Sequence, residues 1–125
     1  MNSFKIGDTE FEIGKISFSD DNDIINLEVS GNENVFDKLT EKGDSKWDWA
    51  LYPPKIYFRD IPFKSKSIVV DENLLNKYDI ALYMMEYNDF TGTLNISDKI
   101  ISVSGQVDIM GEVLPISINI ERDSL

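Results

Sequence analysis

The sequence predicts a mainly β protein, with an α+β fold as the alternative: an antiparallel twisted sheet, curled towards a sandwich or half-barrel, with one or two short helices. Apolar and polar residues alternate over much of the chain, which is the two-residue period of a half-buried strand. Turn-forming pairs such as Gly7-Asp8 and Gly111-Glu112 separate the alternating runs. The 125 residues are 42% hydrophobic and contain no linker or repeat, so we expect a single domain over 1–125.

The first thirty residues predict a hairpin, whose second strand contains a bulge, followed by a third strand. Alternation before and after Gly7-Asp8-Thr9 is typical of two strands joined by a tight turn. The alternation then slips by one residue at Gly14-Lys15, which predicts a β-bulge that returns the flanking apolar pairs to one face. A polar turn over 19–23 follows. The expected strands cover 4–6, 11–18 with the bulge at Gly14-Lys15, and 25–29.

The middle of the chain predicts short helices between strands. Val35, Phe36 and Leu39 form a narrow helical stripe, so we expect a short helix within 32–42 that Gly43 ends. Asp71 is the expected N-cap of a second helical turn that runs to Lys77. Pro53-Pro54 requires a bend or a sheet edge, and 60–62 closes the strand after it. The expected strands cover 47–51, 55–59 and 68–70.

The last third carries the clearest pattern, which predicts a four-stranded antiparallel meander. An apolar, aromatic-rich run over 80–87 has the character of a central strand, and Asn88-Asp89 is its expected turn. The next three runs alternate strictly and are separated by polar or glycine-containing turns. The four strands of this meander are expected over 80–87, 90–96, 101–109 and 114–120.

The set of ionisable residues excludes several common catalytic groups and metal sites. The chain contains no His and no Cys, which removes Ser-His-Asp and Cys-His nucleophiles, disulfides and His/Cys zinc sites. The carboxylate-rich turn around Asp21 lacks the calcium-loop pattern, because Asn26 and Asn32 stand where glycine and glutamate are needed. No phosphate-binding or nucleophile motif is present either. We therefore expect no catalytic residues, no metal and no cofactor.

The net charge of −11 indicates which classes of macromolecule the protein can bind. Acidic residues number 23 against 12 basic ones, and such a surface repels nucleic acid and anionic membranes. A cationic protein is the macromolecule that this field attracts, although acidity also serves solubility. The N-terminus lacks the apolar run of a signal peptide and no stretch reaches the length of a transmembrane helix. We expect a cytoplasmic protein.

The acids are concentrated around one turn, one expected helix and the start of one strand, which predicts an acidic contact face. Trp47 and Trp49 share one face of their expected strand and belong either to the core or to an exposed stacking platform. If they are exposed, the neighbouring carboxylates make a surface suited to Arg. The predicted partner-binding residues are Asp20, Asp21, Asp23, Glu33, Asp37, Glu41, Asp44, Trp47, Asp48 and Trp49.

Residues 51–70 form the one basic island, with four bases and one acid. The bases are Lys55, Arg59, Lys64 and Lys66. They are too few for a nucleic-acid footprint on so anionic a domain, and we expect them to offset neighbouring carboxylates. Alternatively they seat the acidic face of a second copy, which would make a homodimer.

A small, acidic, β-rich chain without a catalytic set resembles the immunity proteins of bacterial toxin systems, including contact-dependent growth inhibition and related polymorphic toxins. The passages nearest to that family are 47–54 and Phe90-Thr91-Gly92-Thr93-Leu94. The resemblance implies a protein that neutralises a cognate toxin, often a nuclease, by covering its active site. Two other classes stay open: a small-ligand or carbohydrate-binding β module that uses the aromatic residues near Pro53, and a carboxylate-based enzyme.

Overall fold

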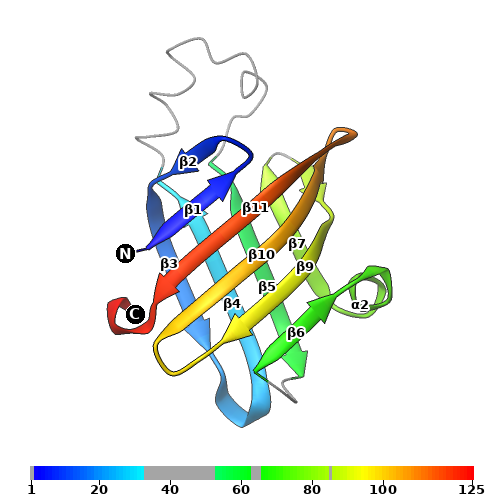
Figure 1. Ribbon diagram of the computed structural model, residues 1–125. Helices are drawn as coiled ribbons and strands as arrows, with labels where there is room; N and C mark the ends of the chain where they lie inside the picture. The colour runs from blue at the N-terminus through cyan, green and yellow to red at the C-terminus, as the bar shows by residue number, and fades with distance from the viewer. Residues whose placement is uncertain (1, 33–52, 63–65, 85) are drawn as a thin grey trace.

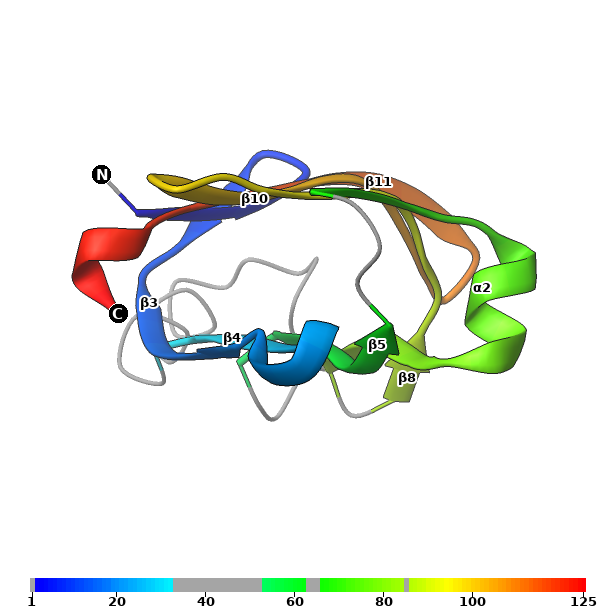
Figure 2. The same ribbon diagram turned by 90° about the horizontal axis from the view of Figure 1, so that it is seen from below.

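A computed structural model describes residues 2–32, 53–62, 66–84 and 86–125 of the chain, and it contains two antiparallel β-sheets packed face to face (Figures 1 and 2). Sheet A has the strand order β2-β1-β11-β10-β9-β6, and sheet B has the order β3-β4-β5-β7-β8. The predicted mainly β class is confirmed. Both sheets are open, and they form a two-layer sandwich. Sheet A consists of β1 Ser3–Ile6, β2 Thr9–Phe11, β6 Ser67–Val70, β9 Phe90–Ile96, β10 Ile100–Ile109 and β11 Glu112–Glu121. Sheet B consists of β3 Ile13–Ser19, β4 Ile24–Gly31, β5 Lys55–Pro62, β7 Asp79–Met84 and β8 Glu86–Asn88.

The predicted N-terminal hairpin and bulge are confirmed. β1 pairs with β2 in the register Lys5↔Glu10, and the pairing of β3 with β4 shifts between Ile13 and Lys15. One detail differs from the expectation. The predicted strand 11–18 is divided at Glu12, because Phe11 pairs within sheet A whereas Ile13 begins the edge strand of sheet B. The chain thus passes from one layer to the other at this point.

The middle of the chain is confirmed where the structure describes it. Asp71 caps the helix α2, Glu72–Lys77, through its Oδ1, which accepts a hydrogen bond from the Leu74 N–H at 3.0 Å. β5 extends beyond the predicted end at 59, because β4 continues to pair with it as far as Ile24↔Pro62. The predicted helix within 32–42 and the predicted strand 47–51 lie outside the described residues, apart from Asn32.

The predicted four-stranded meander is wrong in its first strand. β9, β10 and β11 are consecutive neighbours, but 80–87 belongs to sheet B as β7 and β8, and β7 pairs with β5. The fourth neighbour in sheet A is β1, which pairs with β11. The buried Asn88 donates its side-chain N–H groups to the carbonyls of Leu82 and Glu86. These bonds close the β7–β8 hairpin inside sheet B, and the chain crosses to sheet A only afterwards.

The core lies between the two sheets and is built from the inward-facing residues of the alternating runs. Phe58 of sheet B meets Phe90 of sheet A edge to face, with ring centroids 5.7 Å apart. Gly92 and Gly105 face each other across β9 and β10, and a Cβ on Gly105 would lie 2.1 Å from the carbonyl oxygen of Thr91. The two strands therefore approach more closely here than any side chain permits. Among the described residues, no helix has the length and apolar character needed to cross a bilayer.

Candidate interaction site

The connection between β3 and β4 presents the predicted carboxylates of Asp20, Asp21 and Asp23 to solvent. We call residues 20–23 the acidic turn. Asn22 and Asp23 have φ values of 56° and 59°, a left-handed conformation that Asn and Asp tolerate better than most residues. Asp20 Oδ2 lies 4.0 Å from a guanidinium nitrogen of Arg122. Within the described part of the chain, no base lies within ion-pair distance of Asp21 or Asp23.

Arg122 lies next to the acidic turn and contacts both sheets. It begins the 3₁₀ turn η3, Arg122–Ser124, and its Nη1 donates a hydrogen bond of 3.0 Å to the Ser97 carbonyl. Its guanidinium carbon lies 5.3 Å from the centre of the Phe18 ring on β3. Arg122 thus connects η3 to the β9–β10 turn of sheet A and to the lower end of β3 in sheet B. As a result, η3 lies beside β3 at the side of the sandwich (Figure 2).

The other predicted contact residues cannot be placed around the acidic turn. Glu33, Asp37, Glu41, Asp44, Trp47, Asp48 and Trp49 all lie outside the described residues. Their assignment to an acidic face therefore stays a prediction, as does the choice between core and surface for the two tryptophans.

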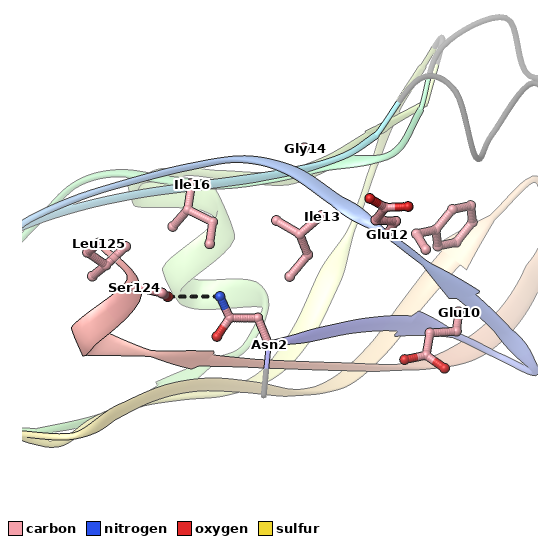
Figure 3. A pocket seen from close by; sticks show the side chains of 9 residues that line it. Asn2, Glu10, Glu12, Ile13, Gly14, Ile16, Ser124 and Leu125 are labelled. Atoms are coloured by element: carbon pink, nitrogen blue, oxygen red, sulfur yellow. Dashed lines mark hydrogen bonds between the residues drawn. The ribbon is translucent and has the colours of Figure 1, made fainter.

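A groove opens between the edge strand of each sheet, along the upper half of β3 (Figure 3). We call it the β2–β3 groove; its volume is about 740 Å³. Ile13 and Ile16 project from β3 into it, facing Asn2 and Ser124, whose side chains are joined by a hydrogen bond of 2.8 Å. Its described lining residues are Asn2, Glu10, Phe11, Glu12, Ile13, Gly14, Ile16, Ser124 and Leu125. No local sequence pattern predicts this groove, because its lining comes from both ends of the chain.

Comparison with known proteins returns no match: no protein-family model matches the sequence, and neither does any curated protein or solved structure.

The outer face of sheet B carries the charged and aromatic side chains of β5 and its neighbours. Tyr57 points to this face, where the Arg59 guanidinium lies 4.0 Å from its ring centre and Tyr87 contacts its edge. The neighbouring Phe58 points to the other side of β5 and lies in the core. Tyr57 is only 3% exposed, and its burial together with the neighbouring Asp79 carboxylate raises its pKa to about 12. The alternation of 56–58 carries the signal for this division.

The predicted role of the basic island is confirmed for its described members. Lys55 lies 2.9 Å from Glu28, and its ammonium lowers the pKa of that carboxyl below the ordinary value. Arg59 lies 3.0 Å from Asp79, and Lys66 lies 3.9 Å from Asp98. Lys64 lies outside the described residues. These bases offset carboxylates of the same chain.

The outer face of sheet A is nearly free of charge. Its strands place small polar side chains in cross-strand rows, one of which runs Ser3, Asn119, Ser102, Asn95 and Ser67. The next row holds Lys5 and Glu10 at one edge, followed by neutral residues. Apart from Glu10, the acids of sheet A lie at strand ends and in connections.

The described residues contain no group of three or more Asp, Glu, His or Cys side chains able to hold a metal ion. Among the described groups, Lys55 lowers the pKa of Glu28, and burial together with the Asp79 carboxylate raises the pKa of Tyr57. The arrangement offers two contact surfaces: an exposed acidic turn at one end of β3, and at the other end a groove that combines the apolar Ile13 and Ile16 with carboxylates.

Proposed function

We propose that the protein is an immunity protein, which binds a cognate toxin and neutralises it by covering the toxin's active site. The observation that supports this proposal is the acidic turn, where three exposed carboxylates project from one connection of a two-sheet scaffold. A chain of net charge −11 attracts a cationic protein over long distances, and such steering raises the association rate at low salt. A nuclease fits this field best, because a groove that binds phosphates is itself basic.

Affinity capture from the cells that make this protein, followed by association kinetics with the captured partner, tests the proposal. We expect a basic toxin whose association rate falls steeply as salt is raised. The double variant Asp21→Lys/Asp23→Asn should slow association about tenfold at low salt, because it removes three units of negative charge from the contact. Asn is chosen at position 23 because it tolerates the positive φ there.

The matched control is Asp89→Asn/Glu112→Lys, which changes the charge by the same amount at the opposite end of the sandwich (Figure 1). This variant should slow association less, because its charges are further from the contact. A neutral or acidic partner, or equal effects of the two double variants, would contradict the assignment of the acidic turn to the contact surface.

A further inference from the structure

We propose that the β2–β3 groove is a docking site for an extended segment of the same cationic partner. In this arrangement the segment lies along the edge of β3, places an apolar side chain against Ile13 and Ile16, and directs a Lys or Arg side chain to Glu12. The inference rests on the proposed function, which supplies the class of partner, and it adds a second contact that the acidic turn alone does not provide.

The position of β3 in its sheet supports an extended occupant. β3 is the last strand of sheet B and β2 is the last strand of sheet A, so the groove lies between two sheet edges. An edge strand offers backbone N–H and C=O groups to a further strand, and added strands are a common mode of peptide recognition. η3 stands beside the lower end of β3 through Arg122 and Phe18, so the part of the edge that the described residues leave uncovered is the upper half at the groove.

The apolar part of the groove calls for an apolar side chain in the segment. Ile13 and Ile16 are half-buried and pack on the core with one side while the other side faces the groove. Leu125, which closes the groove below, is 52% exposed. A Val- or Leu-sized side chain placed between these three residues would remove their remaining apolar surface from water. Since strand side chains alternate, its neighbours in the segment then point outwards.

The charge at the groove selects cationic neighbours. Glu10 and Glu12 are exposed on its wall, and no Lys or Arg is among its described lining residues. Lys5 pairs in register with Glu10 on the outer face of sheet A, which leaves Glu12 as the carboxylate nearest the isoleucines. A segment in which Lys or Arg alternates with an apolar residue matches this arrangement in both spacing and sign.

The groove and the acidic turn lie on one continuous contact path. They are joined by β3, whose seven residues span roughly 20 Å at about 3.3 Å per residue. An ordinary protein interface of about 800 Å² per partner is wide enough to cover both. One cationic partner can therefore engage the acidic turn with its basic surface and the groove with an extended segment.

A hexapeptide alternating Lys and Val, acetylated and amidated, tests the groove without the natural partner. Titration into methyl-labelled protein should shift the methyl signals of Ile13, Ile16 and Leu125, whereas a Glu-Val hexapeptide should leave them unchanged. Ile24, which is 42% exposed and follows the acidic turn, serves as the reporter of purely electrostatic binding. Shifts at Ile24 alone, no shifts at millimolar peptide, or equal shifts with the Glu-Val peptide would each overturn the proposal, the last by indicating a general apolar ligand site.

A pair of variants separates the groove from the remaining surface. Glu12→Lys/Leu125→Ser should weaken binding of the Lys-Val peptide about tenfold, because it reverses the charge and removes an apolar wall. The control Glu112→Lys/Val113→Ser also reverses one charge and replaces one exposed apolar side chain by Ser, but at the start of β11, away from the groove. Val113 is 56% exposed, and this variant should leave the affinity for the peptide unchanged. If the peptide fails while the acidic-turn variant still slows association with a captured toxin, the groove inference is wrong and the proposed function stands. If the peptide binds but the captured partner is not basic, the proposed function is wrong, and of the groove inference only the preference for an extended cationic segment stands.

Discussion

Gly105→Ala should destabilise the protein strongly, because β9 and β10 touch at this position. A Cβ added to Gly105 would lie 2.1 Å from the Thr91 carbonyl oxygen and 2.6 Å from the Gly92 Cα, and both are backbone atoms that cannot rotate away. The strands must separate by about 1 Å, and forcing extra volume into a packed region costs about 1–3 kcal/mol or somewhat more. Weakened ladder hydrogen bonds add to this cost.

Gly111→Ala is the matched control. Gly111 has a φ of 87°, but no heavy atom lies within 4 Å of an added Cβ, so only backbone strain opposes the substitution. Left-handed strain costs about 1–2 kcal/mol, and the loss of chain entropy in the unfolded state returns about 0.4–1 kcal/mol in both variants. We therefore expect net losses of about 3 kcal/mol for Gly105→Ala and about 1 kcal/mol for Gly111→Ala.

Urea denaturation followed by circular dichroism measures both losses. With an m-value of about 2 kcal/mol per molar, the midpoint should fall by about 1.5 M for Gly105→Ala and by about 0.5 M for Gly111→Ala. A loss for Gly105→Ala no larger than that for Gly111→Ala would refute the reasoning, because it would mean that the two strands are not in backbone contact.

Three further predictions concern charged and aromatic groups. Lys55 lowers the pKa of Glu28 from 4.5, so this ion pair stabilises the fold above pH 4.5, and its contribution decreases as the pH falls. Lys55→Met should therefore lower the free energy of unfolding by about 0.5 kcal/mol at neutral pH and leave it unchanged in acid, as measured by urea denaturation midpoints. The pKa of Tyr57 is raised from 10.0 to about 12, so stability should fall as the pH rises between these values, and Asp79→Asn should lower this pKa in a phenolate absorbance titration. Arg122→Ala should destabilise by about 1–2 kcal/mol and speed amide exchange in the β9–β10 turn, because the side chain bonds to that turn; unchanged exchange would show that η3 does not hold it.

Alternation in the sequence predicts strands and their faces well, but it carries no information on which strands pair. The bulge at Gly14-Lys15 is readable because one inserted residue reverses the inward phase. The sheet assignment of 80–87 is not readable, since Leu82 in sheet B and Leu94 in sheet A face the same core from opposite layers. Pairing depends on long-range contacts, which a local pattern does not contain.

The candidate site shows the same division between local and long-range information. The acidic turn is a run of neighbouring residues and follows directly from the sequence. The β2–β3 groove needs Asn2 and Ser124 to meet β3, and that contact joins residues 122 positions apart. The outer-face position of Tyr57 follows from the alternation of 56–58, but its cover by Arg59 and Tyr87 depends on the pairing of β5 and β7.

The pairing of β1 with β11 determines when sheet A can form during synthesis of the chain. At about 5–20 residues per second, the ribosome needs roughly 5–20 s after making β1 before β11 emerges to receive it. Until then the β1–β2 hairpin has no neighbour within sheet A, and the inner surface of sheet B stays uncovered there. Whatever the protein binds, it becomes competent only after translation of its final strand, and the waiting chain is the form that chaperones and proteases meet.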